Sequence, residues 1–283
     1  MGGRRAAALV LLLAGAATAA PAQDTVSLRL LPPSGQVTGY HTELAAWIAS
    51  PMMPPTDSTT PTVTLRWDLQ RRVEASGASG ITWLDIVDSS SIDMPAMRAA
   101  NPQFGLGGDV LRGLRTRTRV TDTGREIATD VLAAPAPTAL PLLLRGIVSL
   151  AMTSSRLTTF AVPDHAVSPG ATWTDSVTYA MPVQPELAGS VLAGGGTAVG
   201  AFRFERLERR PGGRVAILSA TAVVDAAALE TSAAATMHFT GTAQFELDLD
   251  GARLARSEVS LDGTMLTRYG AVPTRIRIVR RAQ

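Results

Sequence analysis

Period-two alternation of apolar and polar residues is the feature that most constrains this chain. It is longest in MHFTGTAQFELDL, at positions 237–249, where apolar residues and glycine occupy one face and polar residues the other. It recurs in TVTLRWDLQ, at positions 62–70, and in TRIRIVRR, at positions 274–281, until Val279 and Arg280 break the pattern. Because successive side chains of a strand point to opposite faces, these segments predict antiparallel sheet with one buried and one solvated face.

The alternation predicts a mainly β fold of about a dozen strands. It also predicts which large apolar side chains point inward. These are Val63, Leu65, Trp67, Trp83, Phe202, Phe204, Phe239, Phe245, Leu247, Ile276 and Ile278.

One helix is expected between the strands. From Leu140 to Met152 the apolar residues recur at helical spacing, and Thr138 is a suitable N-cap, so we predict an amphipathic helix over 138–153. Two aperiodic stretches rich in proline or glycine, Ser50 to Thr62 and Met94 to Gly108, are predicted to be exposed loops.

The two halves of the sequence resemble each other. Each contains a glycine turn before an aromatic-bearing strand, an arginine-paired strand, a second glycine turn with its strand, and a late hairpin. The matched ranges are 32–44 with 167–179, 65–72 with 202–210, 80–87 with 213–220, and 118–131 with 245–259. An internal duplication is therefore predicted.

The expected organisation has four parts: a signal peptide over 1–22, an N-terminal β-unit over 23–137, a connecting helix over 138–153, and a C-terminal β-unit over 154–283. The fold class is two related antiparallel β-units joined by one amphipathic helix. Alternation alone leaves open whether they form a curved sheet, a half-barrel or a sandwich.

The triplet Asp122-Thr123-Gly124 matches the loop that carries the catalytic carboxylate of aspartic proteases. It lies between two alternating strands, in the position that Asp250-Gly251 takes in the second half. Asp and Gly are favoured in tight hairpins. A protease dyad needs two equivalent carboxylates that share a proton, and the second half lacks the Thr-Gly. We interpret the triplet as a turn.

The first 22 residues have the pattern of a secretory signal. Arg4 and Arg5 precede an apolar stretch, and Ala20-Pro21-Ala22 forms a small-x-small cleavage site. The mature chain is expected to begin at Gln23 and to be periplasmic or extracellular. No later stretch is long and apolar enough to suggest a membrane span after signal cleavage.

Composition excludes several function classes. The chain has no cysteine, which rules out disulfides, thiol catalysis and thiolate metal sites. Of 26 basic and 24 acidic residues, two arginines leave with the signal, so the mature chain is close to neutral. A neutral chain lacks the basic excess that nucleic-acid binding needs.

No constellation for catalysis stands out in the sequence. The three histidines, His41, His165 and His238, have no metal-ligand spacing. Asp248 and Asp250 mimic only part of a calcium loop. We therefore expect no enzyme activity, no catalytic residue, no metal site and no cofactor, and the sequence names no ligand-binding residue.

Two motifs carry a resemblance to a known family. A P-G-x-x-W strand start is formed by Pro169, Gly170 and Trp173, and a later F-x-x-D-x-x-G-x-x-L hairpin runs from Phe245 to Leu254. The chain resembles an uncharacterised family of exported bacterial β-rich envelope proteins, classed as a domain of unknown function. The resemblance implies an envelope location and supplies no catalytic residues.

Two hypotheses for the function follow. In the first, the protein is a structural or interaction module whose partner is another envelope protein. In the second, it is a carrier or binding protein for a lipid or other apolar small molecule, held on the dry face of the sheet. A cavity distinguishes the two, and alternation does not reveal cavities.

Overall fold

The computed structural model describes residues 25–49, 59–100, 109–133, 158–181, 193–229, 234–267 and 270–283. These residues form one antiparallel sheet of 11 strands, together with one short helix. The elements in chain order are β1 (Val37–Ile48), β2 (Val63–Gly77), β3 (Gly80–Asp93), α1 (Pro95–Ala100), β4 (Arg115–Val120), β5 (Glu126–Ala133), β6 (Thr172–Met181), β7 (Ala193–Arg210), β8 (Gly213–Leu229), β9 (Ala234–Asp248), β10 (Arg253–Thr267) and β11 (Gly270–Ala282).

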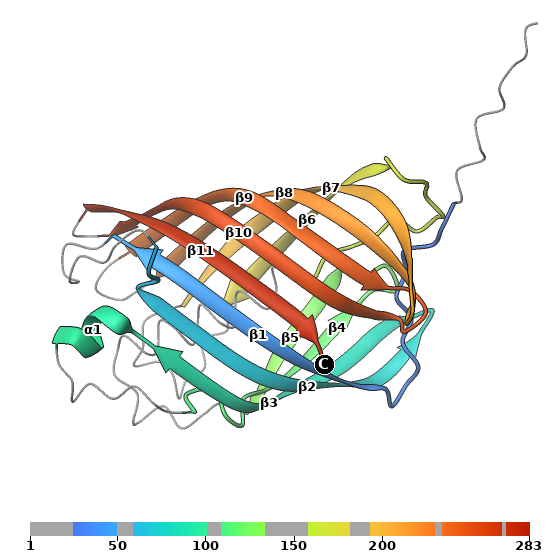
Figure 1. Ribbon diagram of the computed structural model, residues 1–283, viewed down its shortest axis with the longest axis horizontal. Helices are drawn as coiled ribbons and strands as arrows, with labels where there is room; N and C mark the ends of the chain where they lie inside the picture. Colours follow the sequence, from blue (N-terminus) through green and yellow to red (C-terminus); the bar gives the residue numbers. More distant parts are fainter. Residues whose placement is uncertain are drawn as a thin grey trace, which may run out of the picture.

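The sheet consists of two meanders placed side by side. Its order is β5-β4-β3-β2-β1-β11-β10-β9-β8-β7-β6, so every neighbour is consecutive in sequence except the central pair, β1 and β11. This pair is antiparallel, with Leu44 opposite Ile278. Figure 1 shows that the sheet is strongly curved. The chain therefore joins its first and last strands in the middle of one continuous sheet.

The prediction of a mainly β fold is confirmed, and the described strands form a single antiparallel sheet. The strands predicted for the two units belong to the same sheet, because β1 and β11 pair instead of each exposing an unpaired edge. The helix predicted over 138–153 lies entirely outside the described residues. Within the described ranges, no helix has the length and apolarity needed to cross a membrane.

The loop predicted from Met94 to Gly108 is wrong at its start, where Pro95–Ala100 forms α1. Proline fits the first turn of a helix because the amide hydrogen that it lacks has no partner there in any case. The Arg98 amide donates to the Met94 carbonyl at 3.0 Å, and the Arg98 guanidinium lies 2.9 Å from Asp93. The rest of this loop, and most of the loop predicted from Ser50 to Thr62, lie outside the described residues.

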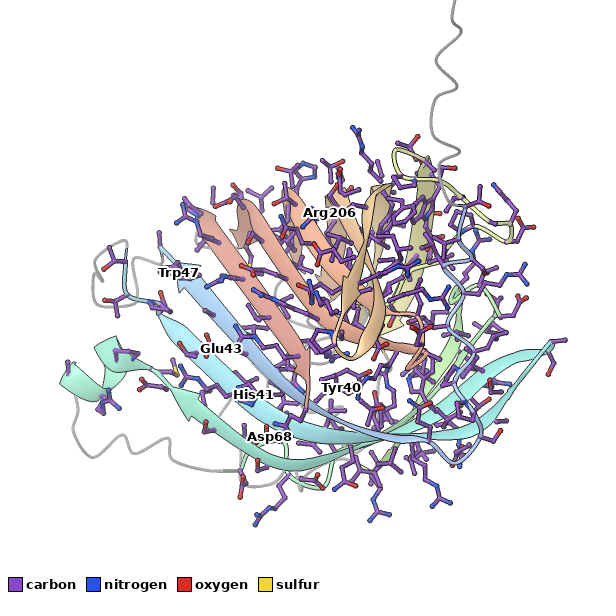
Figure 2. All side chains as sticks on the ribbon, turned by 45° about the vertical axis from the view of Figure 1, so that its right-hand side comes forward. Tyr40, His41, Glu43, Trp47, Asp68 and Arg206 are labelled. Carbon is purple, nitrogen blue, oxygen red and sulfur yellow. The ribbon has the colours of Figure 1, made fainter. Side chains whose placement is uncertain are left out.

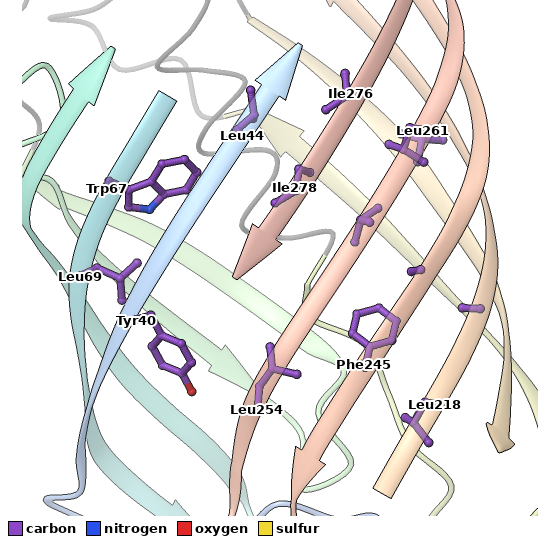
Figure 3. Packing of buried hydrophobic residues seen from close by; sticks show 14 of the residues in the cluster. Tyr40, Leu44, Trp67, Leu69, Leu218, Phe245, Leu254, Leu261, Ile276 and Ile278 are labelled. Carbon is purple, nitrogen blue, oxygen red and sulfur yellow. The ribbon is translucent and has the colours of Figure 1, made fainter. Parts of the chain in front are cut away.

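The inner face of the sheet carries the hydrophobic core. Along β1 the side chains alternate, so that Tyr40 and Leu44 are buried whereas His41 and Glu43 are half-buried on the other face (Figure 2). All 11 residues predicted to point inward are buried, with exposed fractions between 0% and 9%. Ten of them belong to one cluster, part of which is drawn in Figure 3; Trp83 belongs to a second cluster with Val73, Ile81 and Val120.

Two irregular segments, 25–33 and 158–167, pack together and contribute to the core. Val26 and Val167 exchange two backbone hydrogen bonds, of 2.9 and 3.0 Å. Phe160 stacks on Phe202, with ring centroids 4.9 Å apart, and also contacts Phe245 at 4.3 Å. Aromatic contacts of this kind hold the 158–167 segment against the inner face.

The segment Asp122-Thr123-Gly124 is a turn, as predicted. It connects β4 to β5, and Gly124 has a φ of +92° that favours glycine. The Gly124 amide donates to the Thr121 carbonyl at 3.0 Å, and a Cβ at Gly124 would lie 2.7 Å from the Phe160 carbonyl oxygen. The Asp122 carboxylate forms an ion pair of 3.1 Å with Arg29. Its geometry is that of a turn residue.

Candidate functional site

A cavity of about 110 Å³ lies between one end of the inner face and the two irregular segments. We call it the Tyr40 cavity. Most of its walls are apolar, and the polar groups on them are few. Its lining side chains include Leu28, Gln36, Tyr40, Arg71, Val73, Trp83, Thr158, Val162, Leu247, Arg253 and Leu254. An apolar cavity with a few polar groups at fixed positions is the usual form of a small-molecule site.

Arg71 enters the cavity as half of an ion pair between neighbouring strands. Arg71 on β2 lies opposite Asp85 on β3, and its guanidinium donates two hydrogen bonds to that carboxylate, of 2.8 and 2.7 Å. Burial opposes the charge of Arg71, but the field of Asp85 and the hydrogen bonds to it outweigh burial and raise the pKa of Arg71. The positive charge of Arg71 therefore has its counter-charge in the same bidentate pair.

Arg280 lies beside this pair, and no carboxylate of the described residues pairs with it. Its side chain is 1% exposed, and it donates hydrogen bonds to the hydroxyls of Thr42, at 3.2 Å, and Thr158, at 3.0 Å. Burial, together with repulsion from Arg71, lowers the pKa of Arg280 to about 10. The guanidinium consequently remains charged at neutral pH, although burying an unpaired charge is costly.

Tyr40 stands between the two arginines. The guanidinium carbon of Arg71 lies 5.5 Å from the centroid of the Tyr40 ring, and that of Arg280 lies 5.8 Å from it. Burial raises the pKa of the Tyr40 phenol, so the hydroxyl keeps its proton at neutral pH. Arg71 also lies 4.2 Å from the Trp83 ring centroid. Aromatic faces thus stabilise both cations in part, without cancelling their charge.

Several buried polar atoms around the cavity have no hydrogen-bond partner in the part of the chain that the structure describes. They include Oε1 of Gln36 and Nε1 of Trp83, both on cavity-lining residues, and Nη2 of Arg280 and Oγ of Ser257 on the adjoining strands. Buried polar atoms in folded proteins are normally paired, so a group of unpaired ones requires a cause. Together they present donors and an acceptor that a bound molecule could satisfy.

The histidines do not contribute to this site, but each one contacts an aspartate. Nδ1 of His41 lies 2.7 Å from Asp68, His238 lies 2.7 Å from Asp225, and His165 lies 2.9 Å from Asp164. Sequence spacing did not reveal the two cross-strand pairs, because each joins neighbouring strands. The hydrogen bond from His41, more than any other cause, lowers the pKa of Asp68.

The partial calcium motif is occupied by internal contacts. The Asp248 carboxylate accepts the Gly251 amide at 2.8 Å, and the Asp250 carboxylate accepts bonds from the Arg214 guanidinium and amide. In the part of the chain that the structure describes, no three His, Asp or Glu side chains come close enough to hold a metal ion.

The cavity residues could have been found in part from the sequence. Arg71 and Arg280 each extend the inward register of an alternating strand, after Leu69 and after Ile278. We interpreted Arg280 as a break in the pattern, whereas the alternation of the backbone continues through it and only the residue type changes. A charged residue at an inward position is therefore the signal that was available.

Neither the family models nor the curated proteins compared with this chain gave a match. Among solved structures, the chain is similar to a presumed exported protein with a YmcC-like fold from Bacteroides fragilis. The similarity covers 90% of this chain and 99% of that one, at 12% sequence identity and a TM-score of 0.35. A similarity of this size carries no argument about a ligand.

Proposed function

We propose that this protein is an exported, non-catalytic binding protein that holds a small apolar molecule in the Tyr40 cavity. The signal pattern of residues 1–22 supports export, with Gln23 as the first mature residue and a periplasmic or extracellular location. The cavity itself is the observation that carries the binding function. A structural module needs only a packed interior. A cavity beside a buried charge lowers the stability of the folded protein, and a bound molecule would offset this loss.

The size of the cavity restricts the ligand. A volume of about 110 Å³ is somewhat smaller than the 150 Å³ or so of an engineered apolar cavity that accepts benzene. A molecule, or the end of a molecule, of about six heavy atoms or fewer is the appropriate scale. We therefore propose a small apolar compound, or one end of a longer one, as the occupant.

A non-catalytic role is supported by the position of the titratable side chains. His41 and His238 lie on solvated strand faces, each engaged by one aspartate, and Asp85 is engaged by two hydrogen bonds from Arg71. General acid–base chemistry needs a group within hydrogen-bond reach of the substrate and free to exchange its proton. The ion pair at the cavity is suited instead to orienting a molecule.

We infer in addition that the two meanders arose by duplication, and that the site formed where they meet. In the first meander, the Gly35 amide donates to the Val73 carbonyl, and the Val73 amide donates to the Gln36 carbonyl. In the second meander, the Gly170 amide donates in the same way to the Phe204 carbonyl, and the Phe204 amide donates to the Ala171 carbonyl. Both glycines have positive φ, and a bulge follows both Val73 and Phe204. In this correspondence β1 to β5 match β6 to β10, and β11, which carries Arg280, is the extra strand.

The binding function is tested on protein exported by a bacterial host and purified without detergent. Organic extraction and mass spectrometry should recover a small apolar compound in stoichiometric amount. Re-addition of the compound should raise the melting temperature, because a ligand that binds only the folded state stabilises it. Val162→Phe, which fills the cavity, should abolish both effects, whereas Val37→Phe at a 55% exposed position should not. A folded protein without any bound compound, and without a thermal shift, would contradict the proposal.

The interaction-module alternative is favoured by one specific observation. Strands β5 and β6 end the sheet, and on β5 the apolar residues Ile127 and Leu132 are 58% and 46% exposed. An edge strand with exposed apolar residues can pair with another chain. If it does so with a second copy, analytical ultracentrifugation should detect a dimer that Ile127→Lys dissociates.

A further inference from the structure

A short polar strip lies on the inner face, beside the ion pair of Arg71 and Asp85. Cross-strand partners place seven inward residues in one row, from Trp67 on β2 through β1, β11, β10, β9 and β8 to Phe204 on β7. The row reads Trp67, Thr42, Arg280, Ser257, Phe245, Leu218 and Phe204, and each member is at most 3% exposed. Its second to fourth members are polar, and they are flanked in the row by Trp67 and Phe245, which are labelled in Figure 3.

The centre of this strip has an excess of one positive charge. Arg71 and Asp85 cancel each other in a bidentate pair, and Arg253 at the cavity wall lies 3.1 Å from Asp248. Among the described residues, Arg280 has only hydroxyl partners, Thr42 and Thr158. One guanidinium charge is therefore left without a counter-charge inside the sheet.

Two donors in the strip are unused. Nη2 of Arg280 is buried and has no partner among the described residues, and the same holds for Oγ of Ser257, which lies directly across from Arg280 in the β10–β11 register. A guanidinium N–H and a hydroxyl beside each other form a favourable pair of donors for a carboxylate oxygen. The strip adjoins the Tyr40 cavity, because Arg280 donates to Thr158 and lies against Tyr40, and both of these residues line it.

We propose that the ligand of the Tyr40 cavity is an apolar monocarboxylate, whose carboxylate pairs with Arg280 and Ser257 while its apolar body occupies the cavity. This inference rests on the proposed function and specifies its ligand class. A single negative charge balances the single excess cation, whereas a dianion such as a phosphate monoester would leave a new charge unpaired. The aliphatic walls formed by Leu28, Val73, Leu247 and Leu254 suit a hydrocarbon body.

The test compares hexanoate with 1-hexanol by isothermal titration calorimetry on the purified protein. The two probes share the hydrocarbon chain and differ in charge. Hexanoate should bind at least about tenfold more tightly, since a charge-assisted hydrogen bond contributes more than a neutral one. Arg280→Met should reduce hexanoate binding by at least the same factor and leave 1-hexanol unchanged. Ser257→Ala should weaken hexanoate binding by a smaller factor.

Arg277→Met is the matched control. Arg277 lies three residues earlier on the same strand, faces the other side, and pairs with Glu258 at 2.6 Å, so its removal should leave both affinities unchanged. Circular dichroism melts of all variants establish that they are folded; if Arg280→Met does not fold, Ser257→Ala supplies the comparison.

The outcomes separate the inference from the function on which it rests. If both probes bound equally well, the proposed role of the carboxylate would be wrong, whereas the proposal of an apolar binding protein would stand. Binding of neither probe would overturn both. If acetate or inorganic phosphate bound as tightly as hexanoate, the site would be one for free anions, and the proposal that an apolar part of the ligand fills the cavity would be wrong.

Discussion

The guanidinium carbon of Arg280 lies 5.8 Å from the centroid of the Tyr40 ring, although 240 positions separate the two residues in the sequence. Arg280 lies on β11, which pairs with β1, the strand of Tyr40. The contact joins the first and last strands of the sheet. It also brings the buried guanidinium of Arg280 close to the wall of a cavity. Burying this charge should lower the free energy of unfolding of the ligand-free protein.

Replacing Arg280 by methionine should stabilise the ligand-free protein. The substitution removes an uncompensated buried charge and keeps a long apolar side chain, so we expect a gain of about 1–3 kcal/mol in the free energy of unfolding. Guanidinium chloride titration measures it. Arg277→Met, on the solvated face, should instead lower the free energy by about 1 kcal/mol or less. A large loss of stability in Arg280→Met would show that Arg280 is fully compensated within the chain.

Asp85→Asn should have the opposite effect. It leaves Arg71 and Arg280 together near Tyr40 with no carboxylate, and removal of one partner of a buried pair costs about 3–5 kcal/mol. The matched control is Glu74→Gln, which breaks the more exposed pair with Arg117 at 2.8 Å and should cost less than about 1 kcal/mol. Equal effects from the two substitutions in urea unfolding would contradict the structural role of Asp85.

Gly80→Ala should be strongly destabilising, whereas Gly77→Ala in the same hairpin should not. Gly80 has a φ of +113°, and a Cβ there would lie 2.2 Å from the Val120 carbonyl oxygen. Strain and displacement of β4 together should cost more than about 2 kcal/mol. No atom lies within 4 Å of a Cβ at Gly77. Thermal melts of the two alanine variants measure the difference, and similar melting temperatures would show that the β3–β4 contact is loose.

Glu258 should make stability depend on pH in the acid range. Its hydrogen bond from Arg277, more than any other cause, lowers the pKa of Glu258 from its usual value of 4.5. A carboxyl group with a lowered pKa in the folded state contributes stability above its unfolded pKa, and this is lost as pH falls through the folded one.

Since the Glu258 side chain is 28% exposed, Glu258→Gln should cost about 1 kcal/mol at pH 7 and less at pH 3. Asp262→Asn, in the more exposed pair with Arg275 on the same two strands, is the control with little effect. If Glu258→Gln lowered the free energy of unfolding equally at both pH values, the loss could not come from the ionised Glu258 carboxylate.

The sequence predicted the local parts of this fold. Alternation identified the buried side chains from Val63 to Ile278, because a strand with one solvated face imposes a period of two on residue type. The Asp122-Thr123-Gly124 turn was identifiable for a similar reason, since few residues other than glycine tolerate the positive φ at Gly124. The pairing of β1 with β11 was not predictable, because no local pattern indicates which distant strand edge will become the partner.

The candidate site was missed for the same physical reason. Arg280 contacts Thr42 and Thr158, which are 238 and 122 positions away in the sequence. Its burial results from that long-range pairing, and a single arginine at the end of an alternating strand is ordinarily solvent-exposed.

The most direct test of the binding site is a crystal structure of the protein grown with 6-bromohexanoate, in which anomalous scattering locates the bromine. We expect the bromine inside the Tyr40 cavity and the carboxylate within about 3 Å of the Arg280 guanidinium. Bromine found only on the outer surface, with the cavity and Arg280 unchanged, would contradict it.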